Sequence, residues 1–222
     1  MDLRKDQLYF YLLCILHVGS VLIGMTMTSR MILVNINIIN HQFYVTGGIF
    51  FIPIVFFVQD IVTEIYGYYN ARKMLLTTIF VFIVYVFTVY LIGLLPCKNN
   101  DSLCQSFFLI AQTLPRHALS FVISLAVGGT VNNYVLAKLR IAFDRKFLAL
   151  RFISSTAIGE AIFQIIAVMI SWYGTYSIKD TLPLALAAYI YKILFEIFVT
   201  PVNLYACRYL KSIQAEETKN AF

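Results

Sequence analysis

Long apolar runs alternate with short polar breaks along the whole chain. A helix that crosses about 30 Å of hydrocarbon needs roughly 20 apolar residues. Stretches of that length predict six membrane-spanning helices at about residues 8–29, 44–67, 74–96, 107–138, 152–175 and 182–207. Segments that alternate apolar and polar side chains, as in a membrane β-barrel, are not visible in the sequence. We therefore predict an all-α integral membrane protein with six transmembrane helices in a single domain, residues 1–222.

The composition supports a membrane protein and argues against a nucleic-acid partner. Of the 222 residues, 60% are hydrophobic and only 13% are charged, whereas soluble domains have about 25% charged residues. The formal net charge is +6. The Lys and Arg residues cluster in short loops between apolar runs, where the positive-inside rule accounts for them. We expect the lipid bilayer, and not nucleic acid, to be the partner of this basic chain.

The distribution of these basic residues predicts the orientation of the chain. Twelve lie at the two ends and in the second and fourth loops: Arg4, Lys5, Arg72, Lys73, Lys138, Arg140, Arg145, Lys146, Arg151, Arg208, Lys211 and Lys219. Three lie in the remaining loops: Arg30, Lys98 and Lys179. Because cytoplasmic loops carry the excess of Lys and Arg, we predict that both termini are cytoplasmic.

No motif for chemistry on a nucleotide, ester or peptide is present. The sequence has no Walker P-loop, no HExxH, no GxSxG and no His/Cys cluster with metal-ligand spacing. We therefore predict that the protein is not an enzyme and uses no metal or cofactor. Cys97 and Cys104 share one short loop on the predicted outer side. A disulfide and a pair of free thiols both remain open there.

Six ionisable side chains lie within the predicted spans: Asp60, Glu64, Arg116, Glu160, Lys192 and Glu196. Each costs about 2.5 kcal/mol or more in hydrocarbon, so such residues mark a pathway, a ligand or a buried pair. Residues three or four apart share one helical face. This spacing produces polar stripes on the fifth span, at Thr156, Glu160 and Gln164, and on the sixth, at Tyr189, Lys192, Glu196, Thr200 and Asn203. The stripes predict a common polar interior.

Structural alternatives exist for these charges. Lys192 and Glu196 are four apart and could neutralise each other within one helix, and Arg116 could reach the membrane surface. Glu160 has no cation one turn away on its own helix, so it needs a partner from another helix. A polytopic protein with a polar interior and aromatic side chains beside it is typical of a small-solute transporter that binds a planar ligand.

Asp60 and Glu64 are also four apart, so their carboxyl groups project from one face. Like charges that close repel, and at least one of the two must be protonated or matched by a cation. Arg72 and Lys73 are the nearest counter-charges along the chain. Pairing with them would make this motif a structural clamp.

The stretch "DIVTEIYGYYNARK", residues 60–73, has the pattern Asp-x-x-x-Glu-x-Tyr-Gly followed by a basic pair. It resembles the queuosine precursor transporter family. The segments "RFISSTAIGEAIFQ" and "YKILFEIFVTPVNLYACRYLK" are similar to the fifth and last helices of that family. The resemblance implies uptake of a 7-deazaguanine, preQ0 or preQ1, across the bacterial cytoplasmic (inner) membrane for tRNA modification. It also implies a six-helix fold similar to the substrate-binding subunits of energy-coupling-factor transporters.

The resemblance suggests roles for the polar residues. Glu160 or Glu196 would accept hydrogen bonds from the guanine-like edge, and Lys192 and Gln164 would donate to its carbonyl oxygen. Tyr189 would be one of the stacking walls. Asp60, Glu64 and Arg116 are the candidates for an inner gate or a proton-coupling site.

One departure from the family concerns the fifth span. Phe163 and Gln164 stand where family members have an acid followed by Ser or Thr, which leaves queuine or the nucleoside open as cargo. Two alternative functions also remain: a subunit that binds a vitamin or other small heterocycle and needs an external ATPase module, and a structural membrane protein without cargo. The sequence leaves homo-oligomerisation open.

Overall fold

The computed structural model describes residues 5–28, 30–36, 41–97, 101–172, 174 and 178–220. Within these residues, six helical spans are long and apolar enough to cross a membrane. This confirms the predicted all-α membrane protein. Arg4 and Lys98 of the charge count, and the predicted span ends Ser29 and Thr175, lie outside the described residues.

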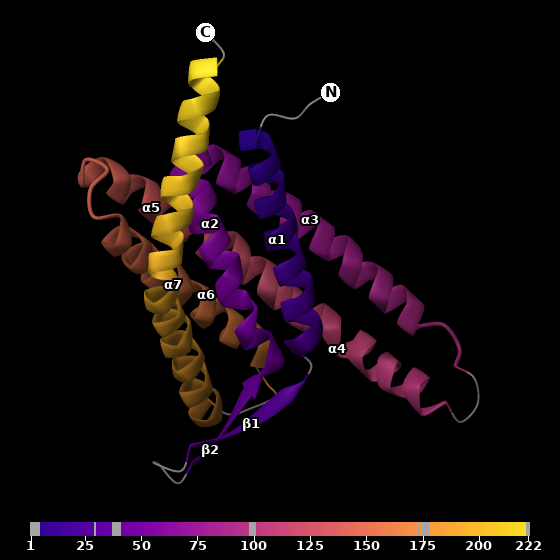
Figure 1. The fold of residues 1–222 in the computed structure, drawn as a ribbon. Helices are drawn as coiled ribbons and strands as arrows, with labels where there is room; N and C mark the ends of the chain where they lie inside the picture. The colour runs from indigo at the N-terminus through magenta and orange to yellow at the C-terminus, as the bar shows by residue number, and fades with distance from the viewer. Residues whose placement is uncertain are drawn as a thin grey trace.

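The helices run back and forth between two ends of the molecule (Figure 1). Their bounds are α1 Lys5–Thr28, α2 Ile52–Tyr66, α3 Tyr68–Gly93, α4 Ser102–Ser124, α5 Thr130–Ala142, α6 Leu148–Trp172 and α7 Ile178–Asn220. A π-helical turn, η2 (Leu125–Gly129), joins α4 to α5, so these three elements form the fourth span. Both chain termini lie at one end, here called the terminal end.

A β-hairpin stands at the opposite end, here called the hairpin end (Figure 1). Strands β1 (Met31–Ile36) and β2 (His41–Thr46) are antiparallel, with Met31 opposite Thr46. The sequence analysis did not predict this hairpin and placed Tyr44 in the second span. The helical part of that span begins instead with a 3-10 turn, η1 (Gly47–Phe50). The strand run "FYV" is apolar and is separated from the apolar run of the span only by Thr46, Gly47 and Gly48, so hydrophobicity alone does not separate strand from span.

Gly48 fixes how this span enters the bundle. A Cβ added at Gly48 would collide with the backbone oxygen of Gly24 and with the hydroxyl of Thr28, both on α1. The position therefore requires a residue without a side chain, which lets the start of α2 pack directly on the end of α1.

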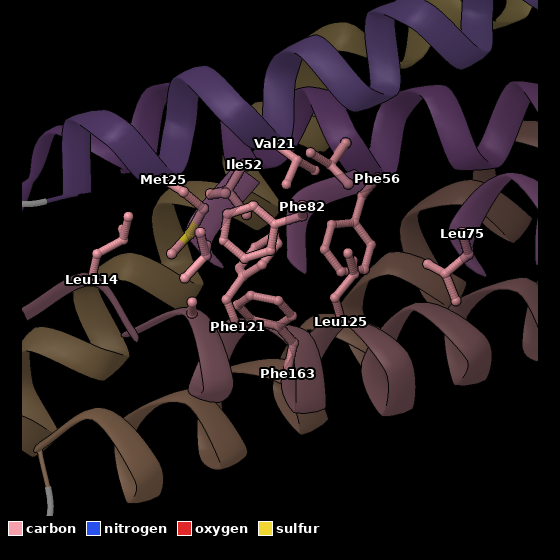
Figure 2. Packing of buried hydrophobic residues seen from close by; sticks show 13 residues of the cluster. Val21, Met25, Ile52, Phe56, Leu75, Phe82, Leu114, Phe121, Leu125 and Phe163 are labelled. Carbon is pink, nitrogen blue, oxygen red and sulfur yellow. The ribbon is translucent and has the colours of Figure 1, made fainter. Parts of the chain in front are cut away.

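Four phenylalanines from four helices form the centre of the apolar core (Figure 2). Phe163 of α6 contacts Phe56 of α2 at 5.9 Å and Phe121 of α4 at 5.7 Å between ring centroids. Phe121 in turn contacts Phe82 of α3 at 5.4 Å. All three pairs meet edge to face, the arrangement that aromatic quadrupoles favour. This chain of rings holds α6 against α2 and α4.

The loop between α3 and α4 is closed by a disulfide between Cys97 and Cys104, whose Cα atoms are 5.8 Å apart. The structure thereby decides between the two alternatives that the sequence left open. The bridge holds the ends of α3 and α4 together at the side of the molecule away from the termini.

Close approach of α6 to the fourth span depends on glycine. A Cβ added at Gly159 would lie 2.7 Å from Asn132 Cβ and 2.9 Å from the carbonyl oxygen of Gly128. Because Gly159 precedes Glu160, this contact also sets the position of the Glu160 carboxylate relative to α5.

We expect Gly159→Ala to lower the thermal stability of the purified protein in detergent, because overpacking a tight contact costs about 1–3 kcal/mol. Gly19→Ala on α1 is the matched control, since no atom lies within 4 Å of an added Cβ there. That control should unfold at or above the wild-type midpoint. An unchanged midpoint for Gly159→Ala would contradict the close packing.

Candidate functional site

A cavity of about 130 Å³ lies at the hairpin end, between α1, η1, α4, α6 and α7. We call it the hairpin-side cavity. Its polar lining residues are Thr28, Thr46, His117, Ser120, Gln164, Ser171 and Lys192. Apolar side chains, among them Met25, Phe121 and Phe163, supply the remaining wall. A small concave site with apolar walls and a few polar groups is typical of a ligand pocket.

The polar groups at the base of this cavity come from α6 and α7. Lys192 Nζ donates to Glu160 Oε2 over 2.6 Å and to Gln164 Oε1 over 3.2 Å. It also lies 4.3 Å from the centroid of the Phe163 ring, close enough for a cation–π contact. Lys192 is 4% exposed and Glu160 is fully buried. Lys192 is therefore the cross-helix partner that the sequence analysis required for Glu160, and the alternative of a Lys192–Glu196 pair within α7 is wrong.

Lys192 bonds to only one of the two carboxylate oxygens of Glu160. Glu160 Oε2 accepts from Lys192, whereas Oε1 is buried and has no hydrogen-bond partner among the described residues. An unsatisfied buried carboxylate oxygen is costly, so it is expected to serve a bound molecule or a water. The base of the cavity thus combines donors on Lys192 with acceptors on Glu160 and Gln164.

Two predicted ligand residues lie elsewhere. Tyr189 Oη donates to the backbone oxygen of Ala157 over 3.2 Å, and the ring is not part of the cavity lining. Glu196 lies one turn of α7 beyond Lys192, where Asn203 Nδ2 donates to its Oε1 over 3.4 Å. The structure therefore brings Glu160, Gln164 and Lys192 together. Gln164 and Lys192 line the cavity, and Glu160 lies behind Lys192, whereas Tyr189 and Glu196 have other partners.

A second polar site lies toward the terminal end. Glu64 of α2 pairs with Arg151 of α6 at 3.0 Å and with Lys211 of α7 at 2.7 Å. Arg140 of α5 donates through Nη1 to the Glu64 backbone oxygen over 2.9 Å. We call Glu64, Arg140, Arg151 and Lys211 the terminus-side cluster. It joins α2, α5, α6 and α7 at one residue, Glu64.

Burial makes the terminus-side cluster a strong constraint. Glu64 is 1% exposed and Arg151 is fully buried, whereas the Lys211 side chain is half-exposed. Arg72 and Lys73 are not the counter-charges of Glu64: both are exposed, and Lys73 lies over the ring of Tyr69 at 4.5 Å. The predicted clamp between Glu64 and these two residues is therefore wrong. Their side chains point outward on α3, whereas Arg151 of α6 and Lys211 of α7 supply the cations that pair with Glu64.

Asp60 lies one turn deeper on α2 and is fully buried. Asn132 Nδ2 of α5 donates to its Oδ1 over 2.8 Å, and Thr156 Oγ1 of α6 donates to its Oδ2 over 3.3 Å. Both partners are uncharged. Asp60 and Glu64 thus share a helical face, as the sequence predicted, but they have different kinds of partner.

Arg116 is separate from both acidic residues. It is exposed on α4, where its Nε donates to the backbone oxygen of Ile170 over 3.4 Å, near the hairpin end of α6. It also lines a second cavity of about 650 Å³ between α3 and α4. The structure does not bring Arg116 to Asp60 or Glu64.

Sequence reasoning missed the interior contacts of Arg151, Lys211 and Asn132. It read Arg151 and Lys211 as charges of a cytoplasmic loop and tail, and it did not single out Asn132. The adjacent Asn132 and Asn133 within an apolar span were a usable signal, because both are amide side chains in a predicted membrane interior.

Comparison with known families gives one match. A family model described as "Putative vitamin uptake transporter" matches residues 46–206, which is more than half of the chain. No curated protein and no solved structure matches the sequence. The expected likeness to energy-coupling-factor subunits therefore stays a prediction.

We expect Glu64→Gln to destabilise the protein strongly, because removing one partner of a buried ion pair leaves Arg151 unpaired and costs about 3–5 kcal/mol. The midpoint of thermal unfolding in detergent measures this loss. Glu216→Gln, the same substitution at an exposed position of α7, should leave the midpoint unchanged. Equal unfolding midpoints for the two variants would contradict a stabilising contribution of the terminus-side cluster.

Proposed function

The chain belongs to the vitamin uptake transporter family, and from this premise we propose that it takes up a 7-deazaguanine precursor of queuosine, preQ0 or preQ1, through the hairpin-side cavity. The observation that carries the proposal is the cluster of Lys192, Gln164 and Glu160 at the base of that cavity. The resemblance of residues 60–73 to the queuosine precursor transporters supports this choice of cargo.

The hydrogen-bonding pattern of the cluster suits a guanine-like edge. Such an edge presents a carbonyl oxygen beside an N–H and an exocyclic amine. We propose that the carbonyl oxygen accepts from Lys192 Nζ, and that the N–H groups donate to the free oxygen of Glu160 and to Gln164 Oε1. Because Glu160 lies behind Lys192 and does not line the cavity, binding requires the ammonium group to move aside.

Aromatic side chains supply the flat walls. Phe121 and Phe163 line the cavity, and we propose them as the stacking surfaces in place of Tyr189, whose hydroxyl is bonded to the α6 backbone. Phe163 stands where the resembling family has an acid. In this chain Glu160 takes the part of the acceptor.

The size of the cavity favours a free base over a nucleoside. Its volume of about 130 Å³ is below the roughly 300–1,000 Å³ of pockets for drug-sized ligands. We therefore place preQ0 and preQ1 ahead of queuine and of the nucleoside as cargo.

The terminus-side cluster is the proposed inner gate. Glu64 joins α2 to α6 and α7 there, and we propose that these ion pairs close the path from the cavity to the terminal end. Opening it requires Glu64 to separate from Lys211, whose side chain is half-exposed and already partly solvated. We propose that the terminal end faces the cytoplasm of a bacterium and that the hairpin end faces outward.

The first test is restoration of queuosine in a bacterial host that neither makes the nucleoside nor carries its own transporter. We expect expression of this protein, with preQ0 or preQ1 supplied at nanomolar concentration, to restore queuosine in tRNA. Lys192→Met should abolish restoration, because the donor to the ligand carbonyl is lost, and an immunoblot of the membrane fraction separates this result from loss of protein caused by the unpaired Glu160. Lys73→Met, at an exposed lysine of α3, is the matched control and should restore fully.

Failure of both preQ0 and preQ1 with wild-type protein present in the membrane would contradict the proposed cargo. Restoration by wild type and by Lys192→Met alike would keep the cargo and reject the binding site.

Reporter fusions test the orientation. Alkaline phosphatase is active only outside the cytoplasm, whereas green fluorescent protein fluoresces inside it. A fluorescent protein fused after Phe222 should fluoresce, and alkaline phosphatase inserted between Cys97 and Cys104 should be active. The reverse pair of results would invert the proposed topology.

A further inference from the structure

Two carboxyl groups between the hairpin-side cavity and the terminus-side cluster have no cationic partner. Asp60 on α2 is fully buried, and Glu196 on α7 is 1% exposed. Among the described residues, the ion pairs of the membrane interior engage Glu64 and Glu160, and neither Asp60 nor Glu196 takes part in one. An ionised carboxylate buried without a counter-charge is strongly unfavourable in this environment.

Each of these carboxyl groups faces an asparagine amide that is only half satisfied. Asn132 Nδ2 donates to Asp60, and Asn203 Nδ2 donates to Glu196. The two amide oxygens, Asn132 Oδ1 and Asn203 Oδ1, are buried and have no hydrogen-bond partner within the part of the chain that the structure describes. Both asparagines are fully buried, so bulk water does not supply the missing donors.

A proton on the carboxyl group would supply such a donor. An ionised carboxylate can only accept, whereas a protonated one also has an O–H group that donates. The oxygen and nitrogen of an amide are bonded to the same carbon, so a carboxylic acid can accept from the nitrogen and donate to the oxygen. Protonation would therefore satisfy an amide oxygen that ionisation leaves without a donor.

The surrounding charges do not neutralise this pair. Asp60 and Glu196 act on each other electrostatically, and Glu64 and Glu160 add further negative charge. Apart from the pair itself, the buried ionisable groups on the elements packed around it are His17 on α1, Glu64 on α2, Arg151 and Glu160 on α6, and Lys192 and Cys207 on α7, and the partly exposed Arg140 and Lys211 bond to Glu64. The cations among them bond to Glu64 or to Glu160, and His17 is bonded to Thr78 of α3.

We propose that Asp60 and Glu196 form a proton-binding site, and that the bound proton is carried inward with the cargo. This inference rests on the proposed uptake function. Glu196 is one turn of α7 from Lys192 in the cavity, and Asp60 is one turn of α2 from Glu64 in the terminus-side cluster. The pair therefore connects the substrate site to the inner gate, which is where a coupling ion must act.

Infrared spectroscopy of the purified protein tests this site without any cargo. The carbonyl stretch of a protonated carboxylic acid is separate from the carboxylate bands. At neutral pH, we expect at least one of Asp60→Asn and Glu196→Gln to remove a protonated-acid band. The exposed control Glu216→Gln should remove only carboxylate bands. Loss of carboxylate bands alone in both interior variants would overturn the proposal.

Both interior substitutions replace an acid by its neutral isostere, so folded protein is expected, and thermal unfolding in detergent checks this. If one variant fails to fold, the other still tests the site, because each carboxyl group has its own amide partner.

Proteoliposomes loaded at a different pH from the medium test the coupling, with preQ1 as the probe. We expect the wild type to accumulate preQ1 when the outside is acidic, and Asp60→Asn to equilibrate it without accumulation, so that the ratio of internal to external concentration falls to unity. Accumulation that follows a sodium gradient instead of the pH gradient would overturn the proton site. If the wild type carries no precursor, the proposed cargo fails, and the infrared result decides the proton site independently.

Discussion

The cost of burying an ionisable side chain inside a membrane protein determines the arrangement of this molecule. Glu64 is buried only because Arg151 and Lys211 reach it from two other helices, and Glu160 is buried only because Lys192 does the same. These contacts fix α2 against α6 and α7. The helix that contributes Asp60 and Glu64 belongs to the most buried of the six spans, so the bundle is built around its charges.

Because of this cost, the buried charges gather at two places along the helices, the base of the hairpin-side cavity and the terminus-side cluster. The edge-to-face rings of Phe56, Phe121 and Phe163 hold α6 in place, and Lys192 then lies over Phe163 at the base of the hairpin-side cavity. The terminus-side cluster joins α2, α5, α6 and α7 toward the terminal end. A transporter needs access from one side at a time, and under the proposed gate role of this cluster the arrangement would be one of those two states.

The sequence predicted what depends on a single helix. Glu160 and Gln164 are four residues apart, which placed both on one face of their helix, and that face meets Lys192. The lengths of the apolar runs identified the spans. Partners across helices were not predictable, because helical periodicity does not determine the vertical register between helices. Glu64 was therefore matched with Arg72 and Lys73 nearby in sequence, whereas Arg151 and Lys211 reach it in space. Arg116 was grouped with the acids although it lies near the hairpin end of α6.

The central claim is that Lys192, held by Glu160 and Gln164, binds the polar edge of the cargo. Isothermal titration calorimetry of preQ1 into the purified protein in detergent tests it most directly, because binding is measured apart from transport and energy coupling. The account predicts saturable binding to the wild type and its loss in a folded Lys192→Met variant. Binding of equal affinity to both proteins would contradict it.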